Sequence, residues 1–175
     1  MRKALFLDRD GTLIIDKHYL KNPQEVEVFP GVSDFLKKAL ACDYLLFLFT
    51  NQSGISRGLH TLEDTNACNQ RMLELLQLPE PGFQEIKVAI EGPEEEEGYR
   101  KPSPKFIWEM IEKYNLDPKA SWIIGDKLSD LEAGIRAGIR SAWVASGKPR
   151  DEELDGYIEK HGISTFFHLR EFKLL

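Results

Sequence analysis

Cysteine is scarce in this sequence of 175 residues, which contains only Cys42 and Cys68. The two do not form a Cys-x-x-Cys pair and neither stands beside a histidine, so we expect neither a structural zinc site nor a framework of disulfide bonds. Both are predicted to be ordinary thiols in helices or at helix ends. The core must therefore be apolar, and with 42% hydrophobic residues the chain can form one domain over residues 1–175.

Long hydrophobic runs are lacking near the N-terminus. After a basic start, only the four apolar residues Ala4 to Leu7 precede Asp8. A signal peptide needs a core of roughly 7 to 15 apolar residues, and a membrane span needs about 20. We therefore expect a cytoplasmic protein that does not associate with a membrane.

An excess of basic residues is lacking as well. Lys and Arg number 23 against 29 Asp and Glu, which gives a formal net charge of -6 and a pI near 5.3. A protein that binds the nucleic-acid backbone needs a basic face to neutralise phosphates. A nucleic-acid partner is therefore not expected, and the negative charge favours solubility.

Short apolar segments are present instead, and they alternate along the chain with amphipathic ones. Continuous rather than alternating apolarity is typical of strands in a parallel sheet that is covered on both faces. The predicted strands are Lys3 to Leu7, Tyr44 to Phe49, Ile86 to Ile90, Trp122 to Ile124 and Ser141 to Val144. Their alternation with helices predicts an α/β fold with a doubly wound parallel sheet, in which ligands bind beyond the carboxyl ends of the strands.

Three helix starts carry clear local signals. One helix follows the break at Pro30-Gly31, and another runs to about Leu76 from a capping box in which Thr61 is paired with Asp64. A third is predicted to begin with Ser103 as its N-cap and Pro104 as its first helical residue.

Two carboxylates follow the first predicted strand, in the segment Asp8-Arg9-Asp10-Gly11-Thr12. An Asp-x-Asp-Gly segment alone is a weak signal, because it also occurs in turns and calcium loops. An EF-hand loop would need further oxygen ligands and a terminal Glu, whereas apolar residues follow Thr12 here. Calcium binding is therefore not favoured.

Three more polar clusters follow later strands. Hydroxyl and amide groups that could bind phosphate oxygens occur in Thr50-Asn51-Gln52-Ser53-Gly54, two cations occur in Arg100-Lys101-Pro102, and further carboxylates occur in the segment from Gly125 through Asp126 and Lys127 to Asp130. Each is ambiguous alone, as a turn, a solvated pair of cations or a helix cap. Together they fall where a doubly wound fold gathers its loops.

With these four segments the chain resembles the haloacid dehalogenase (HAD) superfamily of phosphohydrolases. The longer matches, which include Phe6 to Thr12 and Thr50 to Gly58, are similar to the branch that contains heptose-bisphosphate and histidinol-phosphate phosphatases. The resemblance covers about Phe6 to Val144. It implies a magnesium-dependent phosphatase that forms an aspartyl-phosphate.

The resemblance also assigns catalytic roles. Asp8 would be the nucleophile, Asp10 the general acid and base, and Thr50 and Lys101 the ligands of the transferring phosphoryl group. Mg²⁺ would be held by the Asp8 carboxylate, the Asp10 backbone carbonyl and Asp126. Asp130 would support the metal shell or the position of Lys127.

A small phosphorylated metabolite is the partner that the resemblance implies. A sugar bisphosphate such as D-glycero-D-manno-heptose 1,7-bisphosphate is expected first, and histidinol phosphate is the alternative within the branch. The residues expected to contact the substrate are Asp16, Lys17, His18, Tyr19, Asn51, Gln52, Ser53, Arg100 and Lys127.

The sequence departs from this branch in one segment. Heptose-bisphosphate enzymes commonly carry a zinc loop before the Arg-Lys-Pro motif, but residues 92–99 here contain no cysteine or histidine, so no zinc is expected. The run Glu94 to Glu97 is predicted to be a solvated acidic loop. The motif spacings leave no room for a large cap domain.

Other classes remain open from the sequence. The chain could be a phosphotransferase or mutase, or a binding protein without catalytic activity. The presence of Asp8, Asp10, Lys101 and Asp126 argues against a loss of catalysis. A monomer or a small homo-oligomer is expected.

Overall fold

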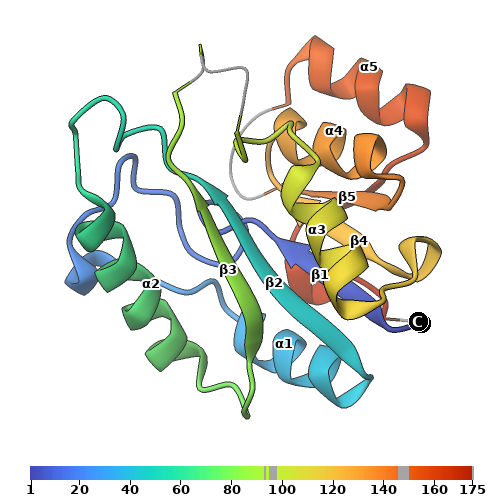
Figure 1. Cartoon of the computed structure of the whole chain (residues 1–175), viewed down its shortest axis with the longest axis horizontal. Coiled ribbons are helices and arrows are strands. Elements are labelled where there is room, and N and C mark those ends of the chain that lie inside the picture. Colours follow the sequence, from blue (N-terminus) through green and yellow to red (C-terminus); the bar gives the residue numbers. More distant parts are fainter. Residues whose placement is uncertain (93, 95–97, 146–149, 175) are drawn as a thin grey trace.

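The computed structural model describes residues 1–92, 94, 98–145 and 150–174. Its centre is one six-stranded sheet with the order β3-β2-β1-β4-β5-β6, in which all neighbouring strands are parallel (Figure 1). The strands are β1 (Lys3–Leu7), β2 (Tyr44–Asn51), β3 (Phe83–Ala89), β4 (Trp122–Gly125), β5 (Arg140–Val144) and β6 (Ser164–Phe166). The predicted doubly wound α/β fold is confirmed.

Helices cover both faces of the sheet. They are α1 (Val32–Ala41), α2 (Leu62–Leu76), α3 (Lys105–Tyr114), α4 (Leu128–Ala137) and α5 (Glu152–His161), with single 3-10 turns at Pro23–Glu25, Pro118–Ala120 and Leu169–Glu171. Helices α1 and α2 pack on one face of the central strands, whereas α3 and α4 pack on the other (Figure 1). Helix α5 packs beside α4 and β5.

The alternation of side chains along β1 explains why the strand is continuously apolar after Lys3. Leu5 and Leu7 point into the core beneath α1 and α2, and Ala4 and Phe6 point into the core beneath α3 and α4. All four are completely buried. A strand enclosed on both faces in this way cannot accept a polar side chain before its carboxyl end, and this places the first carboxylate at Asp8.

The structure corrects several predicted bounds. Strand β3 begins at Phe83 rather than Ile86, because Glu85 is accommodated within it by hydrogen bonds from Lys113 and Tyr114. Strand β2 extends to Asn51 and β5 begins at Arg140. Neither β6 nor α5 was predicted from the sequence.

The start of α3 is also corrected. Pro104, not Ser103, is the N-cap, and the helix begins at Lys105. The Ser103 hydroxyl donates a hydrogen bond to the Gly98 carbonyl at 2.9 Å and accepts only a long one, of 3.4 Å, from the Lys105 amide. Ser103 therefore holds the preceding loop rather than the helix.

The other helix predictions agree with the structure. Thr61 and Asp64 form the capping box of α2, with hydrogen bonds of 3.1 and 2.8 Å, and this helix ends at Leu76. Cys68 is buried within α2, and Cys42 caps the end of α1.

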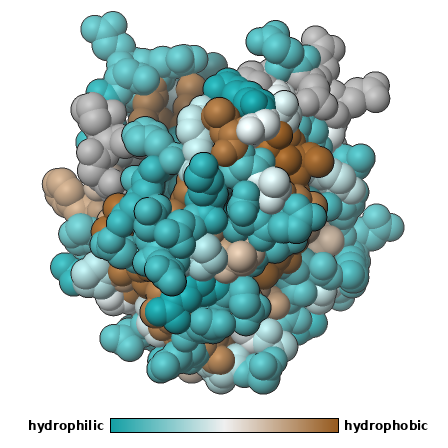
Figure 2. All heavy atoms as spheres, turned by 90° about the vertical axis from the view of Figure 1, so that its left-hand side faces the viewer, coloured by the Kyte–Doolittle hydropathy of each residue, from teal (hydrophilic) through white to brown (hydrophobic). Residues whose placement is uncertain are grey.

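The surface beside α2 is mainly hydrophilic, with apolar side chains in small patches (Figure 2). Within the described ranges, none of the helices is long and apolar enough to span a bilayer.

The segments that follow β1 and β2, residues 8–31 and 52–61, are loops whose only helical part is the turn Pro23–Glu25. These loops gather at the carboxyl edge of the sheet.

Candidate active site

Lys101 lies at the centre of the polar groups at this edge. Its side chain is 2% exposed, and its ammonium nitrogen lies 2.7 Å from Asp8 Oδ1 and 2.5 Å from Asp130 Oδ1. It also donates a hydrogen bond of 2.6 Å to the Phe49 carbonyl. Because a buried charge is costly unless it is paired, these three acceptors are what allow a lysine in this position.

The charges around Lys101 set the protonation of its partners. Burial alone would raise the pKa of Asp8, but Lys101 and Lys127 hold the pKa below its usual value. Burial works against the charge of Lys101, yet Asp130 and Asp8 raise the pKa of the lysine. For Asp130 burial dominates and raises the pKa. Of these two carboxylates, Asp8 is therefore the one whose ionised form its surroundings favour.

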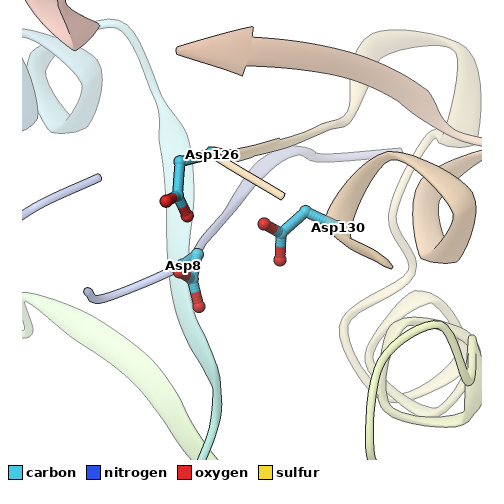
Figure 3. Close-up of side chains that lie close together, drawn as sticks. All are labelled: Asp8, Asp126 and Asp130. Carbon is cyan, nitrogen blue, oxygen red and sulfur yellow. The ribbon is translucent and has the colours of Figure 1, made fainter. Parts of the chain in front are cut away.

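Three buried carboxylates converge at this point. Asp8 follows β1, Asp126 follows β4, and Asp130 lies in the first turn of α4; their ligand atoms all lie within 4.8 Å of one another (Figure 3). The indole of Trp143 fixes the Asp126 backbone by a hydrogen bond of 2.9 Å to its carbonyl. Clustered carboxylate oxygens are the donor set that Mg²⁺ prefers.

Asp130 differs from the other two carboxylates in its contacts. One of its oxygens contacts Lys101, and the other accepts a hydrogen bond of 3.0 Å from the Lys127 amide. Asp8 Oδ2, in contrast, is buried and accepts no hydrogen bond from the described residues. Asp130 thus contacts both the side chain of Lys101 and the backbone of Lys127, and the metal ligation by Asp8 and Asp126 stays a prediction.

Asp10 is held by its neighbours on two sides. Nε and Nη2 of Arg9 lie 3.1 and 3.2 Å from its two oxygens, and the Gln52 amide donates a hydrogen bond of 2.8 Å to Oδ2. The same Gln52 amide donates to the Thr50 hydroxyl at 2.8 Å. Gln52 therefore joins the segment after β1 to the end of β2.

Asn51 contacts the loop that carries Lys101. Its side-chain oxygen accepts a hydrogen bond of 2.9 Å from the Lys101 amide, and its nitrogen donates one of 3.0 Å to the Lys101 carbonyl. These two bonds fix the backbone of Lys101 against β2. A contact of Asn51 with substrate stays a prediction.

A cavity of about 230 Å³ lies beside this cluster. Eight of its ten lining residues are among the predicted site residues, and the other two are Leu20 and Gly54. The eight are Asp10, Asp16, His18, Tyr19, Asn51, Gln52, Ser53 and Lys127. Segments that are distant in sequence thus form one hollow next to Asp8.

Lys127 lies at the edge of this cavity. Desolvation of its ammonium group works against the charged form, but Asp8, Asp126 and Asp130 together raise the pKa of Lys127, although the residue as a whole is exposed. A positive charge therefore lies at the edge of the cavity.

Two predicted substrate contacts do not line the cavity. Lys17 forms an ion pair with Glu27. Arg100 is half-buried, and its guanidinium makes a long hydrogen bond of 3.5 Å to the Glu91 carbonyl. Burial and the nearby Arg57 lower the pKa of Arg100. Of the acidic run, Glu94 is exposed, and Glu95 to Glu97 lie outside the described residues.

Sequence reasoning missed two residues of this network. Arg9 was treated only as the spacer between Asp8 and Asp10, but its side chain is completely buried against Asp10. Asn69, on α2, accepts a hydrogen bond of 2.8 Å from Arg9. The position of a charged residue between Asp8 and Asp10 could have indicated a role for Arg9. Nothing in the sequence, in contrast, links Asn69 to this motif.

Comparisons with known proteins show the family to which the chain belongs. The model of a family described as HAD-hydrolase-like matches residues 98–168, which include Lys101 and Asp126. D-glycero-beta-D-manno-heptose-1,7-bisphosphate 7-phosphatase of Helicobacter pylori is 38% identical over 154 residues, covering 84% of this chain and 86% of the relative. The corresponding alpha-heptose enzyme of Campylobacter jejuni is 38% identical over 160 residues, with 87% of each chain covered.

A solved structure shares the same fold. The D,D-heptose 1,7-bisphosphate phosphatase of B. bronchiseptica, in complex with magnesium and phosphate, superposes with a TM-score of 0.82 at 27% identity and covers 96% of this chain and 94% of that one. The relatives are named phosphatases, and their similarity extends over most of the chain. The chain is therefore a phosphatase and belongs to the HAD-like hydrolases, in the group that includes these heptose-bisphosphate phosphatases.

Proposed function

We propose that this protein is a Mg²⁺-dependent phosphomonoester hydrolase that cleaves a sugar bisphosphate, D-glycero-D-manno-heptose 1,7-bisphosphate, through an aspartyl-phosphate on Asp8. The observation that carries the proposal is the buried Lys101 ammonium, which contacts the Asp8 carboxylate at 2.7 Å beside a cluster of carboxylates. A fixed cation next to an ionised nucleophile is what phosphoryl transfer requires, because both reactants are anionic.

The donor set fits a magnesium ion. Asp8 and Asp126 would supply carboxylate oxygens and Asp10 its backbone carbonyl, with Asp130 supporting them. Gly11 packs against this set so closely that a Cβ there would lie 2.5 Å from Asp126 Oδ2. When bound, Mg²⁺ would neutralise charge on the phosphoryl oxygens.

In the first step a carboxylate oxygen of Asp8 forms a bond to phosphorus while the bond from phosphorus to the sugar oxygen breaks. Asp10 gives a proton to that sugar oxygen, so the sugar leaves as an alcohol. Lys101 and the Thr50 hydroxyl would bind the phosphoryl oxygens; in support, Lys101 contacts Asp8 at 2.7 Å, and the Gln52 amide donates hydrogen bonds to both Thr50 and Asp10.

In the second step water attacks the aspartyl-phosphate. Asp10, now ionised, takes a proton from the water as its oxygen bonds to phosphorus. The bond between phosphorus and Asp8 breaks, which regenerates the carboxylate and releases inorganic phosphate. The carboxyl group of Asp10 lines the cavity, from which both the sugar and the water would approach.

The sugar bisphosphate is supported by the names of the relatives and by the positive edge of the site. Lys127 lines the cavity. Arg100 does not line it, but it precedes Lys101 in the sequence, and its guanidinium makes only one long hydrogen bond, to the Glu91 carbonyl. One phosphate would occupy the position next to Asp8 while the second contacts these outer cations.

Replacing the nucleophile provides the first test. Asp8→Asn should abolish phosphate release, because an amide is a poor nucleophile; its nearly identical shape preserves the packing, although losing the charge beside Lys101 should lower the stability. Steady-state phosphate release measures the effect, and circular dichroism serves as the control for folding. Retention of even about a tenth of the wild-type rate would contradict the assignment of Asp8.

Metal removal provides the second test. EDTA should silence the enzyme and Mg²⁺ should restore it, because the carboxylates that surround the nucleophile need a hard cation. Elemental analysis of the purified protein should find no stoichiometric zinc. One zinc ion per chain would contradict the prediction that the segment before Arg100 holds no zinc.

Closing the space beside Asp126 provides the third test. Gly11→Ala should weaken Mg²⁺ binding, measured by calorimetry, and lower phosphate release, because the new methyl group collides with the carboxylate. Gly138→Ala is the matched control: φ is +84° at Gly11 and +77° at Gly138, but a Cβ at Gly138 meets no atom within 4 Å. Both variants share the backbone strain, so equal metal affinity in the two would contradict a metal site beside Gly11.

Substrate recognition provides the fourth test. Arg100→Ala should lower kcat/KM for the heptose bisphosphate by an amount on the order of 2 kcal/mol and hardly affect p-nitrophenyl phosphate. Lys101→Ala should harm both substrates, since Lys101 acts on the group being transferred. Equal losses for the two substrates in Arg100→Ala would show that Arg100 acts in the chemical step and not in substrate recognition. Faster turnover of histidinol phosphate than of the heptose bisphosphate by the wild type would identify histidinol phosphate as the better substrate.

A further inference from the structure

Arg9 is a buried charge to which the first motif gives no role. Its side chain is completely buried, although arginine is among the side chains that are most costly to bury unpaired. Nε and Nη2 form a fork on the two oxygens of Asp10, at 3.1 and 3.2 Å. The side chain thus turns back onto the very next residue, and this geometry demands an explanation beyond packing.

The rest of the guanidinium is anchored to a different element. Nη1 donates a hydrogen bond of 2.8 Å to Asn69 Oδ1, and Asn69 is itself buried in α2. The backbone of Arg9 is fixed as well, because its carbonyl accepts hydrogen bonds from the amides of residues 12–14, the shortest of them 2.9 Å from Leu13. Arg9 therefore connects Asn69 of α2 to the Asp10 carboxyl group by hydrogen bonds.

The Asp10 carboxyl group receives its third contact from the other side, where the Gln52 amide donates to Oδ2 at 2.8 Å. With Arg9 on both oxygens and Gln52 on one of them, rotation of the carboxyl group would break at least one contact. The group is nevertheless 15% exposed and lines the cavity beside Asp8. It is held in one orientation at the place where a leaving group would be.

We propose that Arg9, anchored by Asn69, is a positioning residue that orients Asp10 for proton transfer to the leaving alcohol. This inference rests on the proposed function, in which Asp10 protonates the sugar oxygen as its bond to phosphorus breaks. Proton transfer depends steeply on geometry, because donor and acceptor must lie within hydrogen-bond reach. Among the described residues, Arg9 itself is not one of those that line the cavity.

A pair of substrates distinguishes this role from a structural one. Phenyl phosphate and p-nitrophenyl phosphate have similar shapes, but phenolate is the more basic leaving group and needs the proton more. The value of kcat/KM reports steps only up to release of the alcohol, so it isolates the step in which Asp10 acts as an acid. The ratio of kcat/KM for the two substrates is therefore the readout.

The variants are Arg9→Lys, which keeps the charge but cannot form the fork, and Asn69→Leu, which removes only the anchor of Arg9. Both should lower kcat/KM for phenyl phosphate about 10-fold more than for p-nitrophenyl phosphate, a part of the 10²- to 10⁴-fold effect that general acids contribute. Asn66→Leu, at an exposed position of the same helix, should leave the ratio unchanged. Asp10→Asn should change the ratio most.

The outcomes distinguish the positioning role of Arg9 from the general-acid role of Asp10. Equal losses for both substrates in Arg9→Lys and Asn69→Leu, or no loss, would overturn the positioning role while leaving the proposed function in place. If Asp10→Asn itself leaves the ratio unchanged, the general-acid assignment is wrong and the positioning role falls with it. Thermal unfolding of each variant identifies any that does not fold, and Asn69→Leu decides the question if Arg9→Lys is unfolded.

Discussion

The burial of one ammonium group is the constraint on which the site depends. Lys101 is enclosed by Asp8 from the end of β1, the Phe49 carbonyl from β2 and Asp130 from α4. Removing one partner of such a buried pair typically costs about 3–5 kcal/mol, so these elements cannot separate without a large penalty. In the proposed mechanism, the same contacts hold Asp8 beside a cation before any substrate binds, which would lessen the repulsion between the carboxylate and an incoming phosphate dianion.

Much of this arrangement could be predicted from the sequence, because the fold converts short motifs into neighbours. Buried parallel strands are apolar up to their ends, so Asp8 and Asp126 mark the carboxyl edge of the sheet where they occur. The parts that could not be predicted depend on tertiary partners. In the sequence, Glu85 interrupts an apolar strand, and only the folded structure shows that Lys113 and Tyr114 pair with it. In the same way, the sequence does not distinguish Asn69 from the other polar residues of α2, and only the folded structure shows its contact with Arg9.

Local signals failed where a side chain had a competing partner. Ser103 before Pro104 has the form of a helix cap, but its hydroxyl binds the Gly98 carbonyl instead. Strand β6, only Ser164–Phe166, has no apolar run because it lies at the edge of the sheet and two of its residues are exposed. Such short edge strands are defined by their neighbour, here β5, and not by their own sequence.

Hydrogen bonds and a cation–π contact fix the described residues next to Lys101. Glu91 accepts a hydrogen bond of 2.7 Å from the Tyr99 amide, and the Tyr99 hydroxyl donates one of 2.9 Å to Glu109 on α3. Lys87 lies 3.6 Å above the Tyr99 ring. The ring thus joins β3 to α3 one residue before Arg100. Because Asn51 then holds the Lys101 backbone by two hydrogen bonds, Arg100 lies between two fixed points, and its long side chain alone remains to adapt to a substrate.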